Sequence, residues 1–169
     1  MKPIAVVTGG AGFIGSHMVD LLVERGFEVN IIDNLVGGDE KNISHHIKNR
    51  KIKIWKDDIR YIKNNHEAFI NAKYVFHFAG IGDIVPSIES PSEYIDINVI
   101  GTTRVLECSR EANVDKFIYA ASSSCYGLAS VPTDEFHEID PMYPYALTKK
   151  LGEDLIVHWS KVYKIIWGD

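Results

Sequence analysis

A glycine-rich turn near the N-terminus constrains the fold of this chain more than any other stretch. The segment Thr8-Gly9-Gly10-Ala11-Gly12-Phe13-Ile14-Gly15 follows an apolar run at 4–7 and leads into apolar residues with helical spacing. A strand, a tight turn and a helix in this order form the turn that binds the diphosphate of a dinucleotide. Gly9 would permit the tight turn, Gly12 would let the backbone approach the pyrophosphate, and Gly15 would let helix and strand pack closely. Taken alone, the pattern fits an ordinary β–α turn equally well.

An aspartate after the second predicted strand favours the dinucleotide interpretation. Residues 28–32 are predicted to form that strand, and Asp33 follows Gly15 at close to the separation expected for the acid that binds an adenosine ribose. Its carboxylate would accept hydrogen bonds from both ribose hydroxyls and repel a 2′-phosphate, which favours NAD over NADP. An aspartate that caps a loop is the alternative. The spacing from the glycine turn makes the cofactor interpretation the stronger one.

Two further strand ends offer contacts to a cofactor. Asp57-Asp58-Ile59-Arg60 follows the third predicted strand, and an acid there could reach an adenine amino group. A helix N-cap explains this pair of acids equally well. His77-Phe78-Ala79-Gly80 follows the fourth predicted strand, and its small residues could let the backbone of a cofactor pass closely.

Strands alternate with helices along the chain. Strands are expected at 2–8, 28–32, 51–55, 73–78, 115–121 and 164–167, and helices at 13–25, 60–71, 94–112 and 145–162. Loops are expected at 35–49, with a short helix, at 84–92, as a loop or helix start, and at 122–143. This alternation predicts an α/β fold with a doubly wound parallel sheet, the Rossmann fold, in one domain over 1–169. Its ligands should lie at the carboxyl ends of the strands.

Composition and charge restrict the partners. The net charge of −5 over 169 residues favours neither nucleic acid nor an anionic membrane as a partner. No apolar run reaches the roughly 18 residues that a membrane span needs. Cys108 and Cys125 lack metal-like spacing and predict reduced thiols in a cytoplasmic protein. The adjacent His45 and His46 have no further ligand cluster in the sequence, so solvated side chains are expected there and no metal site.

A second group of residues suggests acid–base chemistry. Tyr145 and Lys149 are four residues apart, which places both on one face of the predicted helix. Ser122 directly follows the fifth predicted strand, at the same sheet edge as the glycine turn. A nearby ammonium favours the phenolate and lowers the pKa of a tyrosine from about 10. Tyr-x-x-x-Lys alone is common on solvated helix faces, but with a serine and a dinucleotide it could remove a proton and a hydride from a secondary alcohol.

With these residues the chain resembles the extended short-chain dehydrogenase/reductases, in particular nucleotide-sugar epimerases and dehydratases of the UDP-glucose 4-epimerase type. The matching motifs occur in the order of the family and spread over nearly the whole chain. They are the segment from Thr8 to Gly15, Asp33-Asn34, Asp58-Ile59, His77-Phe78-Ala79-Gly80, Asn98-Val99-Ile100-Gly101-Thr102, Ser122 to Gly127, and Tyr145-Ala146-Leu147-Thr148-Lys149.

The resemblance implies NAD as cofactor and a nucleotide sugar, most commonly a UDP-sugar, as substrate. Tyr145 would take the proton of the sugar 4-hydroxyl while NAD accepts the C4 hydride, Ser122 would hold the reacting oxygen, and Lys149 would bind the nicotinamide ribose. In an epimerase the 4-keto sugar then rotates, and the hydride returns to its other face. The implied cofactor-binding residues are Gly9, Gly12, Phe13, Ile14, Gly15, Asp33, Asn34, Asp58, Ile59, Phe78, Ala79, Gly80, Asn98, Tyr145 and Lys149.

Two departures from the family pattern narrow the activity. The 4,6-dehydratases carry Asp-Glu where this chain has Ser123-Ser124, so the acid and base for eliminating water are absent and a dehydratase is disfavoured. Gly82 stands where hexose 4-epimerases often carry a lysine near the cofactor phosphates, which indicates a more distant epimerase branch. A reductase or decarboxylase of the same superfamily and a non-catalytic NAD-binding module stay as alternatives.

The family also leads to expectations about length and assembly. Its members are longer, and their second half supplies most of the sugar-nucleotide site, whereas this chain reaches only the expected sixth strand. The cofactor half with its Tyr/Lys pair is therefore expected without the substrate half, leaving a sheet edge and helix faces uncovered. The resemblance further implies a homodimer through the helices at 94–112 and 145–162, although such apolar faces also arise from simple packing on the sheet.

Overall fold

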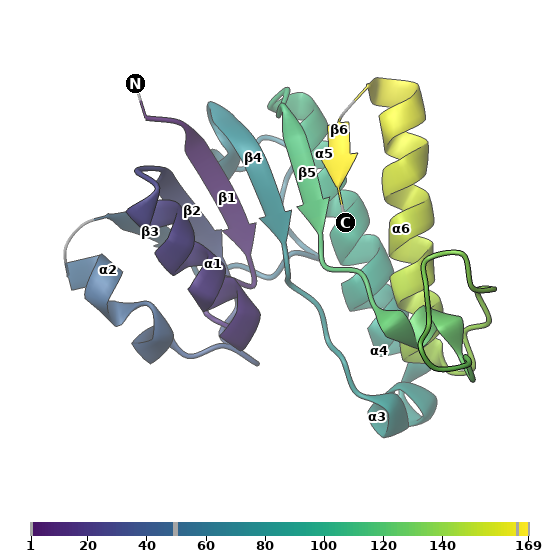
Figure 1. Ribbon diagram of the computed structural model, residues 1–169. Helices are drawn as coiled ribbons and strands as arrows, with labels where there is room; N and C mark the ends of the chain where they lie inside the picture. The colour runs from purple at the N-terminus through teal and green to yellow at the C-terminus, as the bar shows by residue number, and fades with distance from the viewer. Residues whose placement is uncertain (1, 49–50, 165, 169) are drawn as a thin grey trace.

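A single parallel sheet forms the centre of the molecule (Figure 1). The computed structural model describes residues 2–48, 51–164 and 166–168. The strands are β1 (Ile4–Thr8), β2 (Glu28–Ile32), β3 (Ile52–Trp55), β4 (Ala72–His77), β5 (Lys116–Tyr119) and β6 (Ile166–Gly168). They pair in the order β3-β2-β1-β4-β5-β6, and every pairing is parallel. This is the Rossmann strand order, which confirms the predicted doubly wound α/β fold.

Helices cover the sheet and connect its strands. The α-helices are α1 (Phe13–Glu24), α2 (Ser44–Lys48), α3 (Ile84–Glu89), α4 (Pro91–Tyr94), α5 (Thr102–Glu111) and α6 (Pro144–Tyr163). Short 3₁₀ helices are η1 (Glu40–Asn42), η2 (Glu67–Phe69) and η4 (Ser123–Tyr126), and η3 (Ile95–Gly101) is a π-helical segment. The strand arrowheads all point to one edge in Figure 1, where α3, the start of α6 and the 122–143 segment also lie.

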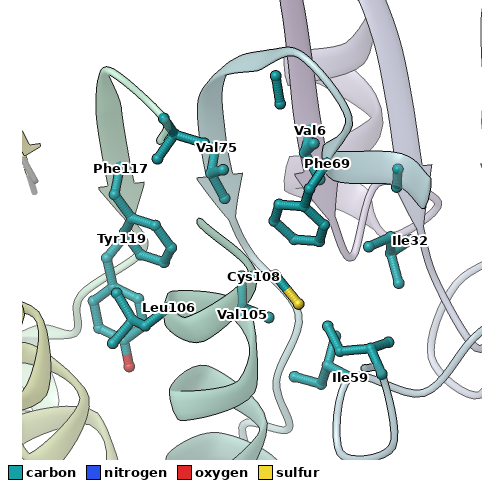
Figure 2. Close-up of a cluster of buried hydrophobic side chains, with 14 of the residues drawn as sticks. Val6, Ile32, Ile59, Phe69, Val75, Val105, Leu106, Cys108, Phe117 and Tyr119 are labelled. Atoms are coloured by element: carbon teal, nitrogen blue, oxygen red, sulfur yellow. The ribbon is translucent and has the colours of Figure 1, made fainter. Parts of the chain in front are cut away.

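The alternation of side chains along β1 produces two hydrophobic cores, one on each face of the sheet. Val7 packs with Val19 of α1 on one face, whereas Val6 packs with Val105 of α5 on the other. All four side chains are fully buried. Figure 2 shows the second core, where side chains of α5 meet Phe117 of β5. A strand that is apolar on both faces is the pattern that a central parallel strand requires.

The helix predicted over 94–112 extends through three consecutive segments, α4, η3 and α5. The π-helical segment η3 was not predicted. It contains Asn98, whose backbone oxygen accepts a hydrogen bond of 2.6 Å from the hydroxyl of Thr102. Single π turns inside helices are frequent at functional sites, because they displace a side chain from the regular helical position.

The helix predicted at 60–71 is wrong: the structure has turns there, followed by η2. Local side-chain bonds compete with the helix. The carboxylate of Asp58 accepts the backbone N–H of Arg60 at 2.9 Å, and the ring of His66 accepts the N–H of Ala68 at 3.2 Å. Such side-chain-to-backbone bonds favour turns over a continuous helix.

Other predicted boundaries are close to the observed ones. The 84–92 stretch forms α3 and the start of α4, and η4 lies within the predicted loop at 122–143. The short helix expected within 35–49 is present as α2, preceded by η1, and residue 49 lies outside the described residues. Residue 165 of the predicted sixth strand also lies outside them. Among the described residues, no helix is both long and apolar enough to span a membrane.

Candidate active site

The glycine turn closes tightly at the carboxyl end of β1. Gly9 has a φ of +69°, and an added Cβ would lie 2.7 Å from the backbone nitrogen of Ala79. At Gly15 a Cβ would overlap the carbonyl of Gly9, with the carbonyl carbon only 2.8 Å away. Both positions therefore exclude any side chain, for steric reasons that involve backbone atoms. The turn has the compact form that the sequence predicts for a diphosphate-binding loop.

Asp33 fastens this turn to the end of β2. Its Oδ2 accepts the N–H of Ala11 at 2.9 Å, and its Oδ1 accepts the N–H of Leu35 at 2.8 Å. The residue is only 7% exposed. It thus caps its own loop, which was the alternative interpretation of this aspartate. Each carboxylate oxygen keeps a further lone pair, so the capping role leaves room for ribose hydroxyls.

A cleft of about 310 Å³ opens at this edge of the sheet. Nine of the predicted cofactor residues line it: Gly9, Gly12, Asp33, Asn34, Asp58, Ile59, Phe78, Ala79 and Gly80. Phe13, Ile14, Gly15, Asn98, Tyr145 and Lys149 do not line this cleft. Gly37, Gly38 and Arg60 line it without having been predicted. The Gly37-Gly38 pair, directly after Asp33-Asn34, was the available signal, since paired glycines permit close backbone approach.

An ion pair lies in the wall of the cleft. The guanidinium of Arg60 donates to both carboxylate oxygens of Asp58, at 3.0 and 2.7 Å, and the Asn34 amide donates to it at 3.2 Å. The hydrogen bonds from Arg60 lower the pKa of Asp58. An adenine amino group would share this carboxylate with Arg60 and Asn34, so the expected contact of Asp58 with adenine stays a prediction.

The second group of residues meets at the carboxyl end of β5. Ser122 caps η4 through a 3.2 Å bond from the N–H of Ser124 to its Oγ, and α6 begins at Pro144. The Tyr145 hydroxyl lies 3.5 Å from Oγ of Ser122 and donates the hydrogen bond between them. Residues 23 positions apart in the sequence are thus brought together.

Lys149 follows Tyr145 by one turn of α6 and contacts a side chain of β5. Its Nζ lies 4.1 Å from the centroid of the Tyr119 ring, a cation–π contact. Burial lowers the pKa of Lys149 to about 8. The Tyr119 ring in turn stacks on the ring of His77 at 5.7 Å. The lysine therefore remains cationic at neutral pH, with an aromatic face supporting its charge.

A buried histidine connects the glycine turn to α5. The Thr102 hydroxyl donates its only proton to the Asn98 carbonyl. Its oxygen, 2.8 Å from Nε2 of His77, must therefore accept a proton that Nε2 carries. The other ring nitrogen, Nδ1, therefore accepts the hydroxyl proton of Thr8 at 2.5 Å. His77 is 1% exposed, and burial lowers its pKa to about 3. The hydrogen bonds around this neutral ring thus have one fixed direction.

Asn98 uses its side chain within the protein. The amide donates to the Ile81 carbonyl at 2.9 Å and to the Thr148 hydroxyl at 3.0 Å, and its oxygen accepts the Ile81 N–H at 2.9 Å. Thr148 donates to the Tyr145 carbonyl at 2.7 Å. Asn98 is 2% exposed. It positions the 79–81 segment against α6, while its predicted direct contact with a cofactor stays a prediction.

Comparison with known proteins agrees with this arrangement. The GDP-mannose 4,6 dehydratase family matches residues 6–167. The chain belongs to this family.

Two of the relatives that this chain resembles are described as 4-epimerases. The UDP-glucose 4-epimerase of Rhizobium meliloti (strain 1021) is 34% identical over 162 residues, which cover 94% of this chain and 47% of that protein. The UDP-N-acetylglucosamine 4-epimerase of Methanobrevibacter ruminantium M1, solved with UDP-N-acetylmuramic acid, superposes with a TM-score of 0.92 at 31% identity. That match covers 99% of this chain and 54% of the other.

A further solved relative contains both ligands of the expected reaction. The UDP-glucuronic acid 4-epimerase of Bacillus cereus, in complex with UDP-glucuronic acid and NAD, has a TM-score of 0.90 at 29% identity. The match covers 97% of this chain and 54% of that one. This chain thus spans about half the length of the curated relatives it matches, and the predicted family membership is confirmed.

Proposed function

We propose that this chain is the cofactor-binding part of an NAD-dependent nucleotide-sugar 4-epimerase. The observation that supports this most strongly is the approach of the Tyr145 hydroxyl to within 3.5 Å of Ser122, at the edge that also bears the glycine turn. The relatives named above are 4-epimerases of UDP-sugars, and one was solved with NAD and a UDP-sugar together. A UDP-sugar is therefore the substrate class that we propose.

The residues of the cleft fit NAD. The turn at Gly9 and Gly15 leaves no room for side chains, so backbone can approach a diphosphate there. Phe13 and Ile14, 79% and 61% exposed, begin α1, whose first N–H groups are free to bind an anion. Asp33 would accept the ribose hydroxyls and repel a 2′-phosphate. When bound, NAD supplies a reversible acceptor for the hydride at C4 of the sugar.

The protein residues would move the proton that accompanies this hydride. Tyr145 would take the proton of the 4-hydroxyl as general base and return it after the sugar has turned over. Ser122 would hold the same oxygen through a hydrogen bond. The ammonium of Lys149 would favour the phenolate form of Tyr145 and bind ribose hydroxyls. The 4-keto sugar must rotate before the hydride returns, and this rotation distinguishes an epimerase from a reductase with the same three residues.

The family name includes a dehydratase, but the chain lacks the groups for that reaction. Ser123 and Ser124 stand in the dehydratase acid–base positions, and the N–H of Ser124 bonds to Ser122. A serine hydroxyl, unlike the carboxylate of Asp or Glu, does not act as a proton-exchanging acid or base at neutral pH. We therefore assign epimerisation, without elimination of water, to this site.

The test is incubation of the full-length protein, which includes the substrate-binding part, with NAD and each of UDP-glucose, UDP-N-acetylglucosamine and UDP-glucuronic acid. We expect the C4 epimer of at least one of them by NMR, with no net absorbance at 340 nm. Accumulation of NADH would identify a reductase instead. Calorimetric binding of NAD with no turnover of any of the three sugars would support a non-catalytic NAD-binding module and contradict the proposal.

We also propose a homodimer and a cytoplasmic location. The helices named for the dimer expose apolar side chains, Ile100 of η3 and Leu147 of α6, each 45% exposed. Sedimentation at micromolar concentration should show a dimer, and a monomer would contradict the dimer proposal.

The proposed cytoplasmic location rests on the two cysteines. Cys108 and Cys125 are buried and unpaired, as reduced thiols are. Fractionation of cells should place the protein in the cytoplasm.

A further inference from the structure

We propose that Asp20, His45 and His46 form a binding site for a divalent transition-metal ion such as Zn²⁺. Asp20 lies on α1, and the two histidines lie on α2. Their three ligand atoms all lie within 4.8 Å of one another. The sequence predicted solvated histidines because no further ligand cluster accompanies them. That expectation is wrong for His46, which is buried, and the fold brings Asp20 next to both rings.

The three ligand atoms converge on one point. Nε2 of His45 and Nε2 of His46 lie 3.0 and 2.6 Å from the same carboxylate oxygen, Oδ1 of Asp20. A tetrahedral Zn²⁺ with bonds of about 2.0–2.2 Å separates its ligand atoms by roughly 3.4 Å. Small rotations of the exposed side chains therefore suffice for an ion to replace the protons now shared between these atoms.

The surroundings hold part of this site in place and leave part open. His46 is 8% exposed, and its backbone N–H bonds to the carbonyl of Ile43, a fully buried core residue. The side chains of Asp20 and His45 are 44% and 54% exposed. An ion would thus have one anchored ligand, two adjustable ligands and access to water for its remaining position, as zinc sites with three protein ligands have.

The donor set selects the class of ion. Two imidazole nitrogens and one carboxylate suit Zn²⁺ and neighbouring transition ions. Mg²⁺ and Ca²⁺ prefer oxygen ligands throughout. The site therefore predicts transition-metal binding that excess Mg²⁺ does not displace.

An ion here would act on the fold and not on the reacting groups. None of the three ligands lines the cleft of the glycine turn. The segment before α2 contacts that turn, however: the N–H of Asp39 and the amide of Asn42 both bond to the Ala11 carbonyl, at 3.0 and 2.8 Å. Joining α2 to α1 through a metal would hold this segment, and thereby the turn, in position.

The experiment titrates chelator-treated protein with Zn²⁺ by calorimetry and with Co²⁺ by visible absorption. We expect one ion per chain, unchanged by excess Mg²⁺, and a Tm increase of about 5–10 °C at free Zn²⁺ near 100 times Kd. Asp20→Asn and His45→Gln change exposed side chains that the fold tolerates, and each should weaken binding at least about tenfold. His158→Gln, on the exposed face of α6, is the matched control and should bind as the wild type does.

Two results would overturn the proposal. The first is no heat with Zn²⁺ and no visible absorption with Co²⁺ for protein that is folded by circular dichroism. The second is equal Zn²⁺ affinity in the wild type, Asp20→Asn and His45→Gln, which would place the ion elsewhere. Because none of these readouts uses NAD or a sugar, failure of the epimerase proposal leaves this one unaffected.

Discussion

The neutral state of His77 couples the stability of the fold to pH. Burial, assisted by the positive charge of Lys149, lowers the pKa of His77 to about 3, against about 6.5 in an unfolded chain. Because the pKa of His77 is lower in the folded state than in the unfolded state, its contribution to the free energy of unfolding has its full value above pH 6.5, the pKa in the unfolded chain. That contribution is lost as the pH falls from 6.5 toward 3, because the unfolded state then binds the additional proton.

The size of the effect follows from these two pKa values. Each unit of pH below 6.5 lowers the free energy of unfolding by up to about 1.4 kcal/mol. Between pH 7.5 and pH 4.5 the loss from His77 alone is on the order of 3 kcal/mol. The hydrogen bonds of the His77 ring also contribute to stability. Without the ring, the Thr8 hydroxyl loses its acceptor, which lowers the free energy of unfolding by about 1–3 kcal/mol at neutral pH.

Urea denaturation at pH 7.5, 6.5, 5.5 and 4.5 measures this coupling in the wild type and in His77→Gln. The variant should be less stable than the wild type at pH 7.5, and between pH 7.5 and pH 4.5 the wild type should lose roughly 3 kcal/mol more stability than the variant does. Groups that titrate in both proteins cancel in the difference, and His158→Gln, with an exposed ring, is the control with no expected change. Parallel stability curves for wild type and His77→Gln would refute a buried, neutral His77.

Three further predictions concern the site. Tyr145→Phe should lower the rate of epimerisation by about 10²–10⁴-fold, and an unchanged rate would remove Tyr145 as the base. Gly15→Ala places a Cβ against the Gly9 carbonyl, so NAD affinity should fall at least about tenfold, and retained affinity would contradict the close packing of the turn. Since the pKa of Lys149 is about 8, the ammonium is lost above that pH, and the rate should decline there. Lys149→Arg should move this decline to higher pH, and the same decline in both proteins would assign it to another group.

Local sequence was enough to predict the parts of the site that depend on chain order. Gly9, Gly15 and Asp33 are separated by fixed distances within one β–α–β unit, so their meeting follows from the motif. Ser122 and Tyr145 are farther apart, yet both follow β5. The rule that parallel strands end at one edge of the sheet placed Ser122 at the edge of the glycine turn, whereas the joint role of Ser122 and Tyr145 was implied by the family resemblance.

Contacts that depend on how particular side chains are placed were not predictable in this way. The helix expected at 60–71 does not form. The side chain of Asp58 bonds to Arg60 and favours a turn there, although the spacing of apolar residues suggested a helix. The cation–π contact of Lys149 with Tyr119 depends on the packing of α6 against β5. The approach of Asp20 to two histidines depends likewise on how α2 packs against α1.

Titration of the purified protein with NAD and with NADP, by calorimetry, tests the central claim most directly. The carboxylate of Asp33, fixed beside the glycine turn by two backbone N–H groups, should accept the ribose of NAD and repel the 2′-phosphate of NADP. We predict one NAD per chain and at least about tenfold weaker binding of NADP. Absence of NAD binding, or equal affinity for the two dinucleotides, would contradict the account.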